Sequence, residues 1–297
     1  MPTPLTVVII TFRRPRLVRG AATAALAQLS PDDELLVVDD GSGDETLEVL
    51  RAIDDGRLRV VSQPNQGQAT ARNTGAREAR HDVLVFLDDD EVPEPGLIEA
   101  HREAQAAGPG RVVMGRPILV VPQRRGDRTI PPGPRDTNAL LADASMSMRR
   151  SELLAVGGYD VSMRGWEDID LGIRFQQAGV RIEVAPGALV THHIGRPYRL
   201  FRSQRLDRGR AQARGVARHG RGIVPPADPP RALDRALVRL AARNRVFAEV
   251  AAGMLWSGVV VGAQIGSWKL QAVCASRAGF ALMAYSEGVE LRRLGVS

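Results

Sequence analysis

Four short apolar runs occur in the first ninety residues, at 5–11, 34–40, 58–63 and 83–88. They are rich in valine, isoleucine and leucine and lack the alternation of a strand that is wet on one face. Continuous runs of this kind are typical of parallel strands with both faces covered. The pattern therefore predicts buried strands in an open sheet.

Helix-like segments lie between these runs, at 16–29, 44–53 and 67–79. Asp44 is available as an N-cap, and Leu47 and Leu50 have helical spacing. Alternating strands and helices of these lengths predict βαβ units with right-handed crossovers. We expect residues 1–105 to form one doubly wound α/β unit.

The second half of the chain continues this pattern less regularly. Strands are predicted at 111–121, 144–148 and 184–191, with helices starting at Ser151 and within 165–179. Residues 123–138 are rich in proline, glycine and charge, which indicates a mobile loop. After residue 195 the chain becomes arginine-rich and then apolar, so we expect a helical C-terminal appendage.

Composition narrows the class of protein. The chain has 297 residues with 44% hydrophobic and 25% charged positions, as expected of a globular protein with either one large α/β domain and an appendage or two domains. The single cysteine, Cys274, excludes an internal disulfide and a cysteine-based zinc site. The N-terminus has no basic leader before its apolar run, so we expect a cytoplasmic protein.

The net charge of +6 raises the question of a nucleic-acid partner. Lys269 is the only lysine, so nearly all basic residues are arginines, a skew that GC-rich coding produces without function. We expect no nucleic-acid partner.

Polar residues follow three of the predicted strands: Thr11, the pair Asp39 and Asp40, and the cluster from Asp88 to Asp90. Ligands of open parallel sheets bind at the carboxyl ends of the strands. Neighbouring carboxylates repel one another, and Mg²⁺ or Mn²⁺ neutralises them while sharing oxygen ligands with substrate phosphates. The alternative is that these aspartates only form turns and helix caps.

Several segments together resemble the family 2 inverting glycosyltransferases of the GT-A fold. They are "VVIITFRRP", "LLVVDDGSGDET", "NQGQATARNTGAREA", "VLVFLDDDEVP" and "GWEDIDLGIRFQQAGVRIEVAPGALVTHH", in order over about residues 5–195. The resemblance implies a mixed, mainly parallel sheet flanked by helices. Residues 1–110 would form the half that binds the nucleotide sugar, and residues 111–195 the acceptor and catalytic half, followed by the appendage at 196–297.

The resemblance also implies roles for individual residues. Asp88 and Asp90 match the DXD motif that holds a divalent metal and the donor diphosphate and ribose. A histidine near the end of the domain would be a further metal ligand, and we favour His192 over His193. The remaining donor-binding positions by resemblance are Thr11, Phe12, Arg13 in place of the usual asparagine, Asp40, Arg72, Asn73 and Asp89.

The acceptor hydroxyl needs a base, because it is a poor nucleophile at neutral pH. By resemblance the base is Asp168, with Glu167 beside it; if a helix begins at Glu167, the two side chains point about 100° apart and only one can face the acceptor. Asp170 pairs with Arg174 in the simplest alternative. Trp166 either presents the flat face of its ring to the acceptor or is buried in the core.

These features predict a metal-dependent inverting glycosyltransferase that moves a sugar from a nucleoside diphosphate sugar to a glycan, lipid-linked or small-molecule acceptor. A UDP-sugar is favoured, with GDP and dTDP as alternatives. The "GSGDET" segment lacks the third glycine of a dinucleotide-binding fingerprint, which argues against a dehydrogenase.

The C-terminal region leaves alternatives open. Its arginines, spaced by three and four, form either a solvated helix face or a face for diphosphate or anionic membrane. Residues 250–268 carry no charge and have glycines at GxxxG spacing, which favours a buried or homodimer-forming helix over attachment to the inner face of the membrane. The alternative function is a non-catalytic protein of the same scaffold that binds an anionic polymer or a membrane surface.

Overall fold

The computed structural model describes residues 3–121, 128–130, 145–193, 198–220, 240–265 and 282–296. The chain divides into two compact units. One comprises Met1–Val120, Thr129–Val161 and Asp168–His193, and the other Val121–Arg128, Ser162–Glu167 and Ile194–Ser297. We refer to them as the sheet unit and the C-terminal unit, and each is described by itself.

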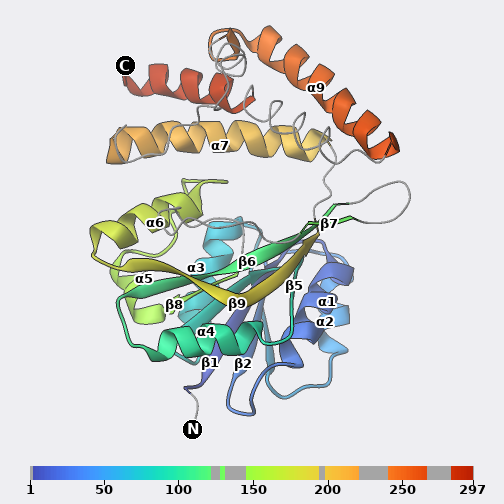
Figure 1. Ribbon diagram of the computed structural model, residues 1–297, viewed down its shortest axis with the longest axis vertical. Helices are drawn as coiled ribbons and strands as arrows, with labels where there is room; N and C mark the ends of the chain where they lie inside the picture. Colours follow the sequence, from blue (N-terminus) through green and yellow to red (C-terminus); the bar gives the residue numbers. More distant parts are fainter. Residues whose placement is uncertain are drawn as a thin grey trace. The chain divides into compact units, whose positions relative to one another are not determined.

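A mixed sheet forms the centre of the sheet unit, with strand order β3-β2-β1-β4-β8-β6-β9-β5 and β7 paired to β6 (Figure 1). The β1–β2, β2–β3, β1–β4 and β6–β9 pairs are parallel, and β8 and β5 pair antiparallel to their neighbours. The strands are β1 (Leu5–Thr11), β2 (Glu34–Asp39), β3 (Leu58–Ser62), β4 (Val83–Asp88), β5 (Glu91–Pro93), β6 (Arg111–Val121), β7 (Arg128–Ile130), β8 (Met146–Arg149) and β9 (Arg181–His193).

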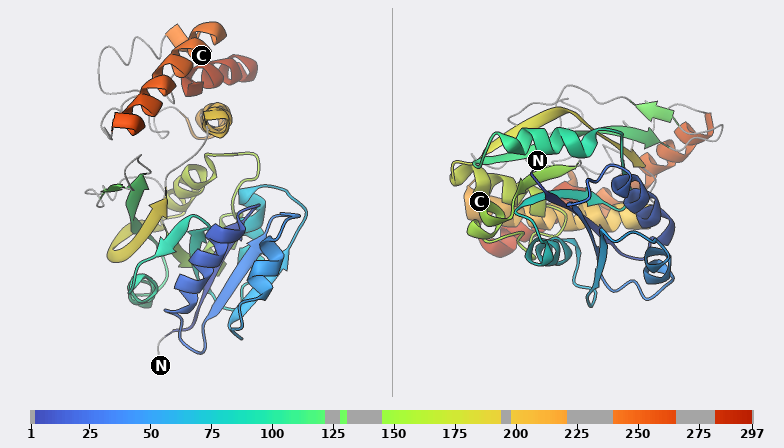
Figure 2. Two further views of the ribbon diagram at one scale, coloured as in Figure 1. Left: turned by 90° about the vertical axis from the view of Figure 1, so that its right-hand side faces the viewer. Right: turned by 90° about the horizontal axis from the view of Figure 1, so that it is seen from below.

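Helices cover both faces of this sheet, which Figures 1 and 2 show from three directions. The first cluster of buried apolar residues joins the sheet to α1, α2 and α4, and the second joins it to α3, α5 and α6. Their bounds are α1 (Pro15–Leu26), α2 (Thr46–Arg51), α3 (Gln68–Glu78), α4 (Leu97–Ala106), α5 (Arg150–Ala155) and α6 (Glu167–Gln177).

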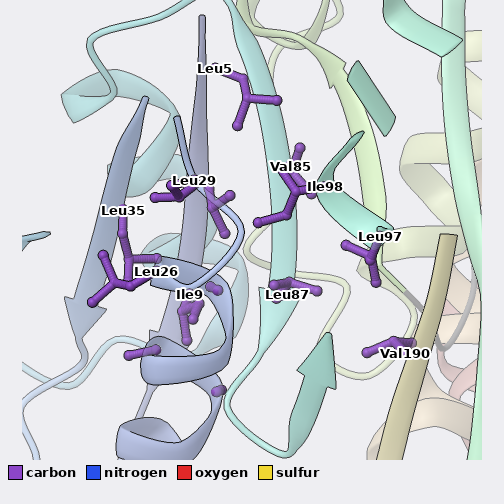
Figure 3. Packing of buried hydrophobic residues seen from close by; sticks show 14 of the residues in the cluster. Leu5, Ile9, Leu26, Leu29, Leu35, Val85, Leu87, Leu97, Ile98 and Val190 are labelled. Atoms are coloured by element: carbon purple, nitrogen blue, oxygen red, sulfur yellow. The ribbon is translucent and has the colours of Figure 1, made fainter. Parts of the chain in front are cut away.

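The two-sided cover explains the unbroken apolar runs. In β1, Val7 and Ile9 belong to the first cluster, while Val8 and Ile10 belong to the second. Figure 3 shows part of the first cluster, in which Ile9 and Val85 from the sheet lie near residues of α1 and α4. The parallel strands predicted from the sequence are confirmed. The prediction that the run at 58–63 is buried is wrong, because β3 lies at the edge of the sheet, where Leu58–Val61 are half-buried and Ser62 is exposed. The predicted helices form with ends shifted by a few residues.

Two elements give no clear signal in the sequence. The segment after Asp90 has no strand pattern, but Glu91–Pro93 forms β5, whose Glu91 pairs with His192 of β9. A three-residue strand has no periodicity of its own and exists because β9 lies beside it. The helix α4 that follows was also not predicted. Of the loop expected at 123–138, only β7 falls within the described residues.

A histidine is completely enclosed between α4 and β8. His101 is 0% exposed, and its ring nitrogens lie 2.9 Å from Ser147 Oγ and 3.0 Å from Ser145 Oγ. Burial lowers the pKa of His101 from 6.5 to about 3. The imidazole is therefore neutral in the folded protein at neutral and mildly acidic pH.

This burial predicts a pH-dependent loss of stability. Below the unfolded pKa of 6.5 the unfolded chain binds a proton that the folded chain excludes, so folding weakens as pH falls. His101 should lower the free energy of unfolding by about 1–2 kcal/mol as the pH falls from 7 to 5. Urea unfolding should show that His101→Gln lowers stability at pH 7 but flattens this pH dependence. His81→Gln, at a half-buried site, is the control, and equal slopes for wild type and His101→Gln would contradict the assignment.

The described helices of the C-terminal unit include α7 (Tyr198–His219), α9 (Arg245–Ile265) and a helix over 282–294. The helix over 282–294 lies tightly against α7, because a Cβ at Gly209 would come within 2.3 Å of the Met283 carbonyl oxygen. Arg202 pairs with Glu249 of α9, and Arg214 Nε lies 3.2 Å from Glu290 Oε1. The predicted helical appendage is thus confirmed. Within the described residues, none of the helices combines the length and apolarity needed to cross a membrane.

Candidate functional site

The polar residues at the carboxyl ends of the strands come together as expected. β1 ends at Thr11, β2 at Asp39 and β4 at Asp88, and β1 lies between the other two strands. Because the three strands are parallel, their ends open on the same edge of the sheet. The acidic cluster after β4 therefore faces the place where a ligand would bind.

Asp89 is an internal anchor of this cluster. Its Oδ2 accepts a hydrogen bond from Thr11 Oγ1 at 2.9 Å, and its Oδ1 lies 2.7 Å from Arg14 Nη1. Burial raises the pKa of Asp89 to about 6, against the opposing effects of Arg14 and Thr11. Both oxygens have protein partners, so Thr11 and Asp89, predicted as donor-binding, bond to each other.

Asp90 lies between a cation and an imidazole. Arg14 Nη1 is 2.9 Å from Asp90 Oδ2, and His192 Nε2 is 3.7 Å from Asp90 Oδ1. Arg14 thus bridges Asp89 and Asp90 and offsets their mutual repulsion. The next residue, Glu91, is only 3% exposed. Burial, together with the negative charges of Asp88 and Asp90, raises the pKa of Glu91 well above its ordinary value.

The chemistry of these side chains fits a divalent metal held in part by the protein. The buried Nδ1 of His192 has no hydrogen-bond partner among the described residues, and the ring is close to Asp90. Across the described ranges, no three histidine, cysteine, aspartate or glutamate side chains converge enough to hold an ion by themselves. Mg²⁺ sites commonly use one or two carboxylates and complete their shell with substrate phosphates and water. The side chain of His193, the other candidate ligand, lies outside the described ones.

Arg72 links the end of β4 to the candidate base. Its Nη2 lies 2.8 Å from Asp88 Oδ1 and its Nη1 lies 3.4 Å from Asp168 Oδ1. The guanidinium carbon is 5.5 Å from the ring centre of Tyr159 in a cation–π contact, and Arg72 is only 5% exposed. A buried, doubly paired arginine therefore fixes two carboxylates, 80 positions apart in the sequence, next to one another.

The next residue on α3, Asn73, holds the loop that carries Tyr159. Asn73 Nδ2 donates to the Tyr159 carbonyl oxygen and its Oδ1 accepts from the Tyr159 backbone N–H, both at 2.8 Å. Asn73 was predicted to bind the donor by resemblance. In the structure Asn73 holds the backbone of Tyr159 in place. The Tyr159 ring in turn contacts the Arg72 guanidinium.

Asp40 organises the loop before α3. Its Oδ1 accepts from Gln63 Nε2 at 2.7 Å and from the backbone N–H of Gln66 at 2.9 Å, and its Oδ2 accepts from the Gly67 N–H at 2.8 Å. Gly67 has φ of 90°, a conformation that favours glycine. Donor binding by Asp40 remains a prediction, and the contacts of its carboxylate fix the conformation of this loop.

Phe12 and Arg13 follow β1 and form the most open part of the site. Phe12 is 40% exposed, and the Arg13 guanidinium lies 5.1 Å from its ring centre. Arg13 has φ of 55° and donates its backbone N–H to Ser42 Oγ at 2.8 Å. An exposed ring backed by a cation is suited to stacking against a planar ligand such as a nucleobase.

The segment around the candidate base begins α6 at Glu167, as expected. Asp168 is partly exposed, whereas Glu167 is 4% exposed. The predicted pairing of Asp170 with Arg174 is confirmed, at 2.8 Å between Oδ2 and Nε. The more accessible of the two adjacent carboxylates is therefore Asp168.

Trp166 lies in the C-terminal unit. Its ring is buried against α7, because a Cβ at Gly215 would come within 2.2 Å of it. This placement matches the alternative of a buried tryptophan, and an acceptor-binding role for Trp166 remains a prediction.

The sequence patterns did not identify three residues of the site, namely Arg14, Glu91 and Tyr159. Arg14 could have been found, because it follows β1 by three positions and so lies at the same mouth as Thr11. Tyr159 could not, because it comes from a loop that only the Asn73 contacts place near α3.

Comparison with known proteins gives a consistent result. Residues 6–146 match the model of the family "Glycosyl transferase family 2". The chain is 31% identical over 208 residues to the pre-mycofactocin glycosyltransferase of Mycobacterium tuberculosis, covering 64% of this chain and 44% of that protein. It is 30% identical over 224 residues to the validoxylamine A glucosyltransferase of Streptomyces hygroscopicus, covering 61% and 49%. The chain thus spans about half the length of these relatives.

Among solved structures, the chain is similar to a mannosyltransferase from Pyrobaculum calidifontis in complex with GDP-Man and Mn²⁺. The TM-score is 0.60 at 18% identity, covering 97% of this chain and 89% of that one. Residues 6–146 are therefore similar to glycosyl transferase family 2, and the sheet has the GT-A fold.

Proposed function

We propose that this chain is a metal-dependent inverting glycosyltransferase that takes its sugar from a nucleoside diphosphate sugar. The observation that carries the proposal is the bridge through Arg72, with Asp88 at 2.8 Å and Asp168 at 3.4 Å. It brings the carboxylate of the DXD motif and a candidate base to one cation. The family match over residues 6–146 and the GDP-Man and Mn²⁺ bound to the similar mannosyltransferase structure support the same proposal.

In this proposal Asp90 and His192 hold the divalent metal, with the donor diphosphate completing its shell. When bound, the metal would stabilise negative charge on the departing diphosphate. Phe12 stacks against the nucleobase, and the loop fixed by Asp40 forms the wall beside it. Arg14 keeps the Asp89 carboxylate in place, so that Asp90 is presented toward the ligand.

Asp168 acts as the base in this proposal. It takes the proton of the acceptor hydroxyl during attack on the anomeric carbon, and single displacement inverts the configuration. Arg72 orients Asp168 through the 3.4 Å contact between Nη1 and Oδ1. A glycan, a lipid-linked sugar and a small molecule are all acceptors of the required chemistry, and a UDP-sugar is the favoured donor.

The test is calorimetric binding of UDP, GDP and dTDP with Mn²⁺ and with excess chelator. One nucleotide should bind in the presence of Mn²⁺ only, and Asp90→Ala should abolish that binding because it removes a metal ligand. Asp32→Ala, at an exposed site, is the matched control and should bind like wild type. Equal nucleotide binding with Mn²⁺ and with chelator would overturn the proposed role of the metal. Failure of all three nucleotides to bind would overturn the proposed activity.

A further inference from the structure

Charge is divided unevenly between the two parts of the chain. Residues 194–297 contain eighteen arginine or lysine side chains against six aspartate or glutamate side chains, an excess of twelve positive charges. Residues 1–193 contain 22 basic and 28 acidic side chains. The net charge of +6 therefore hides a strongly basic C-terminal part and an acidic N-terminal part.

Some of this positive charge stabilises the C-terminal unit itself. Arg202 and Arg214 of α7 pair with Glu249 and Glu290 of the neighbouring helices. At the start of α9 the situation differs, because Arg243 and Arg245 are exposed. This end of α9 therefore presents cations to whatever approaches it.

The same end of α9 carries an apolar stripe on its outer face. Val246, Val250 and Met254, each four residues apart, are 70%, 49% and 71% exposed. The opposite face of the helix is packed, with Ala248 and Ala252 both 0% exposed. Side chains at this spacing lie on one side of a helix, so α9 has an outer apolar stripe in addition to its buried face.

We infer that α9 docks this protein on an anionic lipid surface, through the stripe of Val246, Val250 and Met254 and the cations Arg243 and Arg245. Such a surface accepts apolar side chains at the headgroup boundary and attracts arginines at the same time. A second copy of this chain would bring another strongly basic unit against this one. A nucleic acid would pair with the arginines but leave the stripe in water.

The inference does not depend on the transfer reaction. It does suggest how an acceptor carried by a membrane would be brought close to the sheet unit. Nucleotide binding measured on the same samples separates failure of lipid docking from failure of the proposed activity.

Cosedimentation with vesicles tests the inference. At low salt the full chain should bind to vesicles that contain phosphatidylcholine and phosphatidylglycerol. It should bind much less to vesicles of phosphatidylcholine alone. The double variant Val246→Asp, Met254→Asp should bind at least about tenfold more weakly, because carboxylates at these positions cannot enter the headgroup boundary. Leu154→Asp is the matched control, since Leu154 is an exposed apolar residue of the sheet unit, 48% exposed, and should leave binding unchanged.

A second pair of variants tests the charge. Arg243→Glu with Arg245→Glu should weaken binding about tenfold or more, while Arg181→Glu, also at an exposed arginine, should not. Thermal melts verify that all variants fold. Equal binding to neutral and anionic vesicles, equal losses in the control variants, or no sedimentation with anionic vesicles would each overturn the inference. The inference would also be overturned if the double variant Val246→Asp, Met254→Asp lost dimer formation or nucleic-acid binding but still bound vesicles.

Discussion

Replacing Asp168 with asparagine should lower the rate of glycosyl transfer by about 10²–10⁴-fold, the usual contribution of a positioned base. Asparagine keeps the shape of the side chain and a hydrogen bond to Arg72 but cannot take a proton. Nucleotide binding should remain, because Asp88 and Asp90 are untouched and Arg72 retains its 2.8 Å contact with Asp88. The rate is measured as release of nucleoside diphosphate from the donor that the binding experiment identifies.

Glu167→Gln is the informative comparison, because Glu167 precedes Asp168 on α6 and carries the same chemical group. It is 4% exposed, so we expect an effect on stability with a much smaller effect on the rate. Full loss in Glu167→Gln together with an active Asp168→Asn would assign the base to Glu167. Loss of nucleotide binding in Asp168→Asn would mean that this residue shapes the donor site through Arg72 and is not simply a base.

The second large effect concerns a buried ion pair far from the site. Arg102 of α4 lies 2.7 Å from Asp33 Oδ2, and the two side chains are 4% and 0% exposed. Arg102 Nη1 also donates to the Thr3 carbonyl oxygen at 2.6 Å. Arg102→Ala would leave Asp33 buried and without its cation, so the free energy of unfolding should fall by about 3–5 kcal/mol.

Urea denaturation at pH 7 measures this loss. Arg181→Ala is the control, because that side chain is 65% exposed and should cost less than about 1 kcal/mol. A similar effect of both variants would show that the pair contributes little.

The pH dependence gives a separate check. Burial alone would raise the pKa of Asp33, but the bonds from Arg102, Ser30 and Leu5 lower it below 3.8. The stability from this group is therefore fully present above the unfolded pKa and is lost as pH falls through the lower folded pKa. In Arg102→Ala the carboxyl is easier to protonate, so the difference from wild type should narrow below about pH 4.

Local sequence determined most of the sheet unit. The runs that became β1, β2 and β4 are apolar along their length because helices cover both faces of each strand, a property that each run carries in its own residues. The polar residues that end β1, β2 and β4 follow from the same pattern, since parallel strands place their carboxyl ends together. For this reason the sequence predicts that Thr11, Asp39 and Asp88 lie at the same edge of the sheet.

Tertiary structure alone decided which partner each of these side chains has. Asp88, Asp89 and Asp90 look alike in the sequence, but Arg72 pairs with Asp88, Thr11 and Arg14 bind Asp89, and Arg14 and His192 lie next to Asp90. The strand β5 exists only through its pairing with β9, and Tyr159 reaches Arg72 only through Asn73. Periodicity and propensity report on contacts within a short segment, whereas these interactions join residues tens of positions apart, so only the folded chain specifies them.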